Sequence, residues 1–254
     1  MTDGLCRRAL AGLQEADSVV INPHKMLHVP LQCSALLFRR GLTLLQAVRD
    51  AAPPAPYLFH RSENGGNDGV DEASAGSPSH LWAEATDISR LTLQCGRKGD
   101  ALKLYLMWTF YGQRGFAGYV EGVLGLATRM HSRVLAHPRL LPVSSSPPQL
   151  VNVCFWALPS TQEGSVWSTE EVVAEGVRVG ECTKHVQKAL RKSGRCLVDI
   201  APLEGLPHFF RFIVNNDTFT EAMMDELLED IVRLADAYYV SASPGQGAVP
   251  ADPQ

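Results

Sequence analysis

The 254-residue sequence lacks the features of a membrane-spanning protein and those of a nucleic-acid-binding protein. Its 23 lysine and arginine residues are outnumbered by 27 acidic residues, and a formal net charge of −4 offers no basic field for a phosphate backbone. The long uncharged run at residues 140–162 contains prolines, serines and an asparagine, so it cannot form a membrane span. A hydrophobic content of 45% excludes wholesale disorder and indicates a soluble globular protein.

Paired cysteines and an export signal are also missing. The 6 cysteines lie far apart and form no Cys-x-x-Cys pair, which argues against a zinc site and for free thiols in a reducing compartment. Residues 1–4 lack the basic region and the apolar core of a secretory signal. These absences predict a cytoplasmic protein without a bound metal.

Apolar periodicity predicts alternating strands and helices. We expect a brief buried strand at 18–22 and a second strand at 33–38, with a loop at 23–32 between them. Rigid elements on both sides of such a loop can fix a reactive side chain in place. Gly112 and Gly115 should interrupt a helical region, and Thr220 is an expected N-cap. The other expected helices are 5–13, 100–111, 116–137, 172–192 and the segment after 220, and the other expected strands are 150–158, 195–200 and 209–214.

The composition predicts two domains. Residues 61–80 are rich in Gly, Ser, Asn and acidic residues, and we expect a mobile loop at 51–80 within a first region, 1–140. The pattern changes after the Ser-Ser-Ser-Pro-Pro linker, which predicts a small α+β domain at 149–240 and a disordered tail at 241–254.

Lys25 is the residue that draws attention as a candidate nucleophile. It follows a predicted strand and precedes apolar residues, so a poorly hydrated pocket would disfavour its charged form, and a neutral amine can form a Schiff base. The alternative is an ordinary surface lysine, since lysine is almost never fully buried. Spacing alone does not decide between them.

The segment Asn22-Pro23-His24-Lys25, preceded by Ser18, resembles the cofactor-lysine signature of the group II pyridoxal-phosphate-dependent decarboxylases. The Leu-Gln-Cys-Ser-Ala, Gln-Cys-Gly-Arg and Asn-Val-Cys-Phe-Trp blocks are most similar to the branch that acts on acidic amino acids, with glutamate decarboxylase and cysteine sulfinate decarboxylase. All blocks follow in the family order, at residues 31–35, 57–59, 93–97, 102–108, 152–156 and 209–211.

The resemblance implies an α/β fold, PLP-dependent transferase-like (fold type I), comprising the end of the large domain and the C-terminal small domain. It implies pyridoxal 5'-phosphate as the cofactor and decarboxylation of glutamate, cysteine sulfinate or aspartate through a Schiff base and a quinonoid intermediate. It also implies a homodimer, or a heterodimer with a full-length relative.

The resemblance assigns roles near the cofactor to four residues. Lys25 would hold the cofactor covalently, and His24 would contact the cofactor phosphate or the substrate unless it only packs in its loop. Cys95 and Gly96 match a segment that reaches the cofactor site of the neighbouring subunit. Cys95 could equally be a small buried packing residue. Trp108 and Trp156 are expected in the core rather than at the cofactor.

Two further residues would act on the substrate. Tyr57 matches a loop tyrosine that protonates the substrate carbon, although three prolines just before it stiffen the loop and Tyr57 could instead only pack. Arg211 matches the arginine that clamps the substrate α-carboxylate, because its planar fork forms two parallel hydrogen bonds. The alternative for Arg211 is an ion pair with a nearby acid.

One part of the family pattern is not matched. In the family, the aspartate that pairs with the pyridine nitrogen and most phosphate-binding residues lie well before the lysine, and Asp3 is not a convincing substitute for that aspartate. Two interpretations therefore stay open. The chain is a fragment of a longer enzyme, or it is a non-catalytic truncated paralogue that acts as a dimerisation or regulatory partner.

Overall fold

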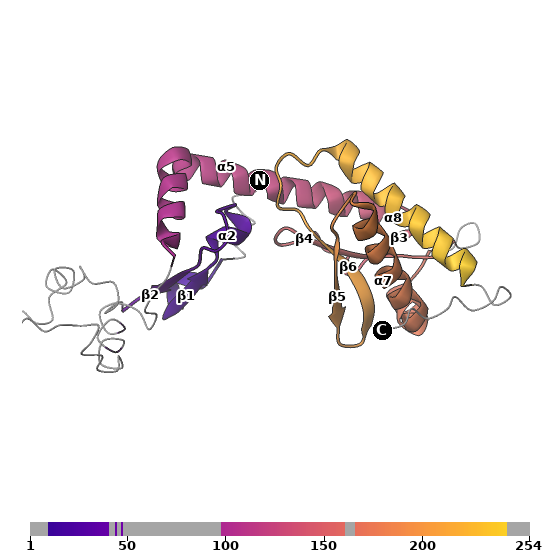
Figure 1. The fold of residues 1–254 in the computed structure, drawn as a ribbon. Helices are drawn as coiled ribbons and strands as arrows, with labels where there is room; N and C mark the ends of the chain where they lie inside the picture. The colour runs from indigo at the N-terminus through magenta and orange to yellow at the C-terminus, as the bar shows by residue number, and fades with distance from the viewer. Residues whose placement is uncertain (1–9, 41–43, 45–46, 48–97, 161–165, 243–254) are drawn as a thin grey trace, which may run out of the picture. The chain divides into compact units, whose positions relative to one another are not determined.

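The computed structural model describes residues 10–40, 44, 47, 98–160 and 166–242. The chain divides into two compact units, one within residues 10–110 and the other within residues 111–254 (Figure 1). Each unit has its own sheet. The expected domain boundary between residues 140 and 149 stays a prediction.

The first unit is built on a two-stranded antiparallel hairpin. Strand β1 (Ser18–Ile21) pairs with β2 (Ala35–Phe38), with Ser18 opposite Phe38 and Ile21 opposite Ala35. A short 3-10 turn, η1 (Leu13–Glu15), precedes β1. Both predicted strands are confirmed, each slightly shorter than expected. The expected burial of the first strand is wrong, because Val20 is 65% and Ile21 37% exposed.

The segment between these strands is not a simple loop, which corrects the expectation for residues 23–32. It begins with the short helix α2 (Pro23–Met26). The reason is local, because Pro23 has its φ fixed near the helical value at the first helical position, where its missing N–H costs nothing. The Lys25 N–H then donates to the Asn22 carbonyl at 2.9 Å and closes the turn.

Helix α5 (Asp100–Ala136) contains the predicted glycine break. Gly112 has φ 62° and ψ −176°, a conformation in which a Cβ atom would be strained, so the helical path changes direction there. The predicted helices on either side of this break are confirmed. The first segment of α5 belongs to the first unit and the second segment to the other.

The second unit contains a four-stranded antiparallel sheet in the order β3-β4-β6-β5. Its strands are β3 (Leu140–Pro142), β4 (Asn152–Ala157), β5 (Asp199–Leu203) and β6 (Leu206–Ile213). Its other helices are α6 (Thr169–Ala174), α7 (Gly176–Ser193) and α8 (Glu221–Ser241). The α+β pattern matches the expectation for this region.

The core of the second unit uses both faces of the sheet. Phe155 and Phe210 are fully buried in a large cluster with residues of α5, α7 and α8. Their chain neighbours Trp156 and Phe209 point to the opposite face and join a smaller cluster that contains Val172 of α6. This alternation is what period-two side-chain placement in a strand requires.

Two further sequence expectations are wrong, one in each unit. Strand β5 begins at Asp199 rather than at residue 195, because Gly194, with φ 71°, ends α7 and the pairing with β6 starts only where Asp199 faces Arg211. Trp108 was expected in a core but is 51% exposed, whereas Trp156 is buried as expected.

Among the residues that the structure describes, no helix combines the length and the apolar character that crossing a membrane requires.

Candidate functional site

Lys25 lies on α2, directly after β1 in the first unit (Figure 1). Its side chain is exposed, and the helix that carries it is only four residues long. The buried Pro23 anchors the start of this helix, and the Val29 N–H donates to the Pro23 carbonyl at 3.1 Å. The local backbone therefore carries Lys25 on a turn that is held at both ends. The exposure of Lys25 does not match the poorly hydrated pocket that the sequence suggested.

His24 contacts the segment before β2. Its Nδ1 lies 2.5 Å from the Cys33 carbonyl oxygen and 3.2 Å from the Cys33 backbone nitrogen. A protonated Nδ1 donates to that carbonyl, and an unprotonated Nδ1 accepts from that N–H. The His24 backbone N–H also donates to the Cys33 carbonyl at 3.3 Å. His24 therefore packs within its turn, which is one of the two alternatives for this residue. Its role near the cofactor stays a prediction.

Asn22 makes a second link across the same turn. The Ser34 hydroxyl donates to Asn22 Oδ1 at 2.6 Å. Together with the contacts of His24 and Cys33, this bond fixes the turn that carries Lys25 against the start of β2. Asn22 therefore helps to shape the turn.

Arg211 lies on β6 in the second unit, opposite Cys154 of β4 and Asp199 of β5. Its guanidinium forms an ion pair with the Asp199 carboxylate, and this hydrogen bond lowers the pKa of Asp199. The Nε of Arg211 is buried and has no hydrogen-bond partner among the described residues. The structure therefore contains the ion pair that was the alternative for Arg211, and the buried Nε makes no hydrogen bond to a described residue.

The structure brings together only part of the predicted set. His24 and Lys25 are neighbours on α2, and Arg211 belongs to the other unit. Tyr57, Cys95 and Gly96 lie outside the described residues, so their roles stay predictions.

Sequence reasoning missed the residues that hold the Lys25 turn. Cys33 and Ser34 contact His24 and Asn22, and Lys103 contacts the carbonyls of Leu31 and Gln32. The signal was present, because these residues belong to blocks 31–35 and 102–108 of the family resemblance. These blocks did not reveal what the residues do, because a side chain that binds backbone carbonyls leaves no pattern in the sequence.

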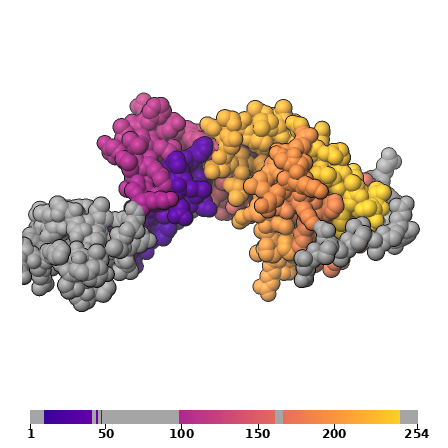
Figure 2. All heavy atoms as spheres, in the orientation of Figure 1, coloured from indigo at the N-terminus to yellow at the C-terminus, as the bar shows by residue number. Residues whose placement is uncertain are grey.

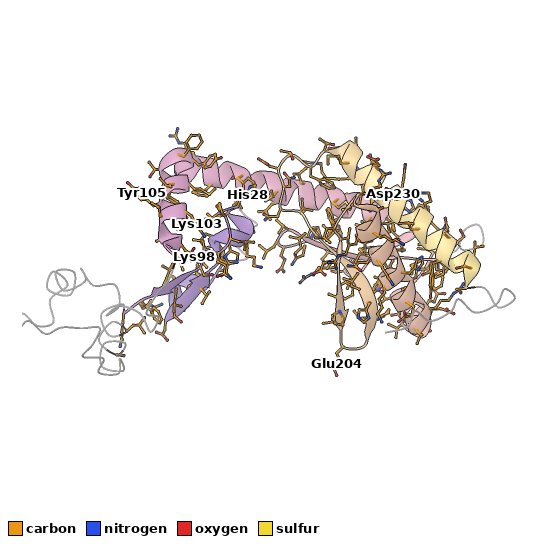
Figure 3. All side chains as sticks on the ribbon, viewed as in Figure 1. His28, Lys98, Lys103, Tyr105, Glu204 and Asp230 are labelled. Atoms are coloured by element: carbon orange, nitrogen blue, oxygen red, sulfur yellow. The ribbon has the colours of Figure 1, made fainter. Side chains whose placement is uncertain are left out.

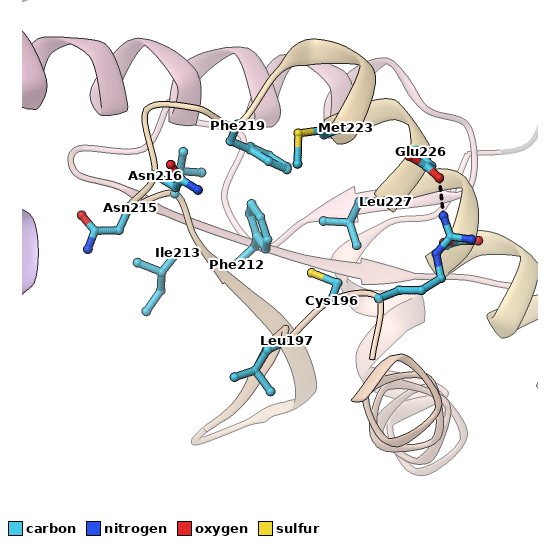
Figure 4. A pocket seen from close by; sticks show the side chains of 13 residues that line it. Cys196, Leu197, Phe212, Ile213, Asn215, Asn216, Phe219, Met223, Glu226 and Leu227 are labelled. Carbon is cyan, nitrogen blue, oxygen red and sulfur yellow. Dashed lines mark hydrogen bonds and ion pairs between the residues drawn. The ribbon is translucent and has the colours of Figure 1, made fainter. Parts of the chain in front are cut away.

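The second unit also contains an open groove of about 430 Å³ between β6, the residues after it and α8 (Figure 4). Phe212, Phe219 and Leu227 form apolar walls, and Arg195 at one end pairs with Glu226. Of the predicted site residues that the structure describes, His24, Lys25 and Arg211, none lines this groove.

Comparison with known proteins identifies the class. Residues 5–158 match the family model described as the pyridoxal-dependent decarboxylase conserved domain, which is more than half of the chain. The chain therefore belongs to the pyridoxal-dependent decarboxylase family. This confirms the family resemblance of the Lys25 segment and the cofactor class expected for it.

Solved structures agree with the family. Mouse cysteine sulfinic acid decarboxylase (CSAD) matches 91% of this chain with 28% identity and a TM-score of 0.70, over 42% of its own length. The Catharanthus roseus tryptophan decarboxylase in complex with L-tryptophan matches 91% of this chain and 39% of its own with 20% identity and a TM-score of 0.61. An Oryza sativa TDC structure with PLP and tryptamine matches 90% of this chain and 40% of its own with 20% identity and a TM-score of 0.64.

These structures confirm the expected fold class, fold type I of the PLP-dependent enzymes. The chain spans about two-fifths of the length of the solved proteins that it matches.

The described residues fit one requirement of pyridoxal phosphate. The cofactor is an aldehyde, and the exposed residue Lys25 carries a primary amine on a turn fixed by Asn22 and His24. The buried, unsatisfied Nε of Arg211 fits the expected binding of a carboxylate.

Proposed function

We propose that this chain supplies the cofactor-binding lysine of a PLP-dependent carboxy-lyase that acts on an acidic amino acid, and that it is a portion of the full enzyme. The observation that carries the proposal is the position of Lys25, exposed on a tied turn directly after a strand, in a chain of the pyridoxal-dependent decarboxylase family. Glutamate, cysteine sulfinate and aspartate are the proposed substrates.

Lys25 and His24 would act at the cofactor. Pyridoxal phosphate, when bound, supplies an electron sink for the carbon that loses carbon dioxide. Lys25 would bind the cofactor through its amine and release it to the substrate amine. His24, whose Nδ1 is held by the Cys33 backbone, would present its other ring nitrogen to the cofactor phosphate or the substrate.

Arg211 would orient the substrate. A guanidinium grips a carboxylate through parallel charge-assisted hydrogen bonds, and the buried Nε of Arg211 has no hydrogen-bond partner among the described residues. Because Asp199 already engages the guanidinium, the substrate carboxylate must compete with that side chain. This competition gives the Arg211 proposal a direct test.

The acidic substrate class rests on two observations. Three sequence blocks resemble the acidic branch of the family, and the 28% identity to mouse CSAD exceeds the 20% identity to the C. roseus tryptophan decarboxylase. Three further parts of the proposal rest on the sequence. Tyr57 would protonate the substrate carbon, Cys95 and Gly96 would belong to a site shared across a homodimer, and the protein would be cytoplasmic.

A second candidate function is a non-catalytic partner that binds a full-length relative. The observation that favours it is an apolar stripe on the first segment of α5, where Leu102, Tyr105 and Leu106 are 59%, 67% and 57% exposed. Their i, i+3, i+4 spacing places them on one helix face, and exposed apolar patches mark interaction surfaces.

The first experiment is reductive trapping. The full chain is incubated with pyridoxal phosphate, treated with borohydride and mapped by peptide mass spectrometry, alone and in the presence of intact mouse CSAD. We expect the label on Lys25 and its loss in Lys25→Ala, while Lys98→Ala, which removes another exposed lysine of the same unit, keeps it. A label elsewhere, or none under either condition, refutes the proposed function.

The second experiment separates the two candidates. Carbon dioxide release is measured with cysteine sulfinate, glutamate, aspartate and tryptophan, with the chain alone and with an inactive lysine variant of the mouse enzyme. Release from an acidic substrate supports the carboxy-lyase. Binding to active mouse enzyme with a change in the activity of that enzyme, and no carbon dioxide release by the chain with the inactive variant, supports the regulatory partner.

A further inference from the structure

Lys103 holds the segment that follows the Lys25 turn. Its Nζ donates to the Leu31 carbonyl at 3.0 Å and to the Gln32 carbonyl at 3.0 Å, and it pairs with Asp100 Oδ1 at 2.7 Å. An ammonium group has three donors, and here all three have an acceptor. The side chain of Lys103 is only 28% exposed. Figure 3 labels it on the first segment of α5.

The two carbonyls lie directly before the residue that holds His24. Gln32 is followed by Cys33, which is 3% exposed and whose backbone lies against His24 Nδ1. His24 in turn is the chain neighbour of Lys25 on α2. Contacts therefore run without a gap from α5 through residues 31–33 to the proposed cofactor lysine.

Charge makes the Lys103 link stronger than a neutral one. Hydrogen bonds from an ammonium group are roughly twice as strong as those between neutral groups. The Asp100 carboxylate, one helical turn before Lys103, also restrains the ammonium group. A neutral side chain of similar length without N–H groups would not form these hydrogen bonds from α5 to the carbonyls of Leu31 and Gln32.

We propose that Lys103 is a positioning residue that fixes residues 31–33 and thereby the orientation of the His24–Lys25 turn toward pyridoxal phosphate. This inference rests on the proposed function of Lys25. A displacement of about 1 Å in a reacting group can lower a rate by about 10²-fold. Loss of the Lys103 hydrogen bonds should therefore slow the reaction of Lys25 with the cofactor, although Lys103 itself does not contact the cofactor.

The test uses the full chain with Lys103→Met, Lys103→Arg and the control Lys98→Met, under the trapping condition in which the wild type is labelled. Lys98 is an exposed lysine two residues before α5, so its replacement removes the same charge. We measure the rate of borohydride-trapped labelling of Lys25 by pyridoxal phosphate and the rate of Lys25 acetylation by acetic anhydride. Hydrogen exchange of residues 27–34 is measured without cofactor.

We expect Lys103→Met to slow pyridoxal phosphate labelling of Lys25 by about 10- to 100-fold and to leave acetylation unchanged, because acetylation needs only an accessible amine. Exchange of residues 27–34 should become faster. Lys103→Arg should restore most of the labelling rate, since arginine keeps the charge and several donors. Lys98→Met should match the wild type.

The two proposals fail in different ways. If Lys103→Met is labelled at the wild-type rate, the positioning role of Lys103 is wrong and the proposed function stands. If labelling and acetylation slow together, the residue supports the fold in general and the positioning role is again wrong. If the wild type is not labelled at Lys25, the proposed function is wrong, and this inference fails with it.

Discussion

The guanidinium of Arg211 has two possible carboxylate partners, one from its own chain and one from a substrate. Asp199 holds one end of it, and the hydrogen bond keeps the pKa of Asp199 below its usual range. Asp199 therefore stays ionised at neutral pH. Whatever stability the exposed pair gives is present above the unfolded pKa of Asp199 and is lost as the pH falls through its lowered folded value.

A pair of substitutions tests the role of Arg211 in the assembled enzyme. Arg211→Gln should raise the KM for an acidic amino acid by about 10-fold or more, because it removes a charge-assisted hydrogen bond to the carboxylate. Asp199→Asn should lower the KM, because it removes the competing acid. Steady-state kinetics checks both, and an unchanged KM in Arg211→Gln contradicts the proposed grip.

Cys182 shows how burial controls a thiol. It is fully buried on α7, and burial raises its pKa to about 11. The thiol is therefore protonated at pH 8, and only the thiolate is a good nucleophile. We expect iodoacetamide to leave Cys182 unmodified in the native chain at pH 8 and to modify it after denaturation, as read by mass spectrometry. Native-state modification faster than that of the half-buried Cys154 would contradict this expectation.

The sign of the accompanying pH effect follows from the same burial. Because the folded pKa of Cys182 lies above the unfolded one, its contribution to stability is complete below the unfolded pKa. That contribution is lost as the pH rises from about 9 toward about 11. Thermal unfolding across this range should show a smaller decline in Cys182→Ala than in the wild type.

Among the elements, α8 has a start that is specified by its own sequence. The Thr220 side chain accepts a hydrogen bond from the Met223 N–H at 3.3 Å, as its position before the apolar run predicted. Ser168 and Glu171 form a full capping box at α6. Helix α6 is only six residues long, while α8 contributes several residues to the large core cluster.

Removal of the α8 cap should destabilise the second unit. Thr220→Ala should lower its free energy of unfolding by about 1 kcal/mol, because the N-terminal N–H groups of the helix lose an acceptor. Urea denaturation followed by circular dichroism measures this change. Thr218→Ala, which lies two residues earlier in the same loop and caps no helix, is the matched control for the loss of a hydroxyl. Equal losses in the two variants would count against the cap.

At the scale of the whole molecule, the two units differ in how much apolar surface they bury. In the second unit, buried residues from β4, β6 and three long helices form a large cluster. In the first unit, the buried hydrophobic side chains among the described residues are Val29 and Cys33. Figure 2 shows the atoms of β1, β2 and the first segment of α5 at the surface in this view, in indigo and magenta. Hairpins of two strands are marginal in water without further packing.

The isolated chain should therefore bind hydrophobic dyes and self-associate. Replacing Leu102, Tyr105 and Leu106 of the α5 stripe by Ser should reduce anilinonaphthalene sulfonate fluorescence and shift the sedimentation profile toward the monomer. Val177→Ser is the control, since Val177 is 85% exposed in the second unit. No difference between the triple variant and this control would show that the stripe is not an association surface.

Local patterns predicted most of the elements. Short apolar runs predicted the strands around Val19 and Phe210, and glycine predicted the break in α5 at Gly112, because these depend on neighbours in the sequence. The short helix at Lys25 was missed, since four residues are too few for a period to show. Exposure of Trp108 was missed because burial depends on what packs against a helix.

By itself, the sequence determined the family of this protein and its candidate cofactor lysine, because the Asn22–Lys25 motif and its accompanying blocks are fixed strings of residues. Only the tertiary structure decided that Cys33, Ser34 and Lys103 hold the turn and that Asp199 engages Arg211. The physical reason is that these contacts join residues distant in the chain, and several of them end on backbone atoms, which every residue possesses. The identity of a side chain therefore does not predict which distant residue it will contact in the folded chain.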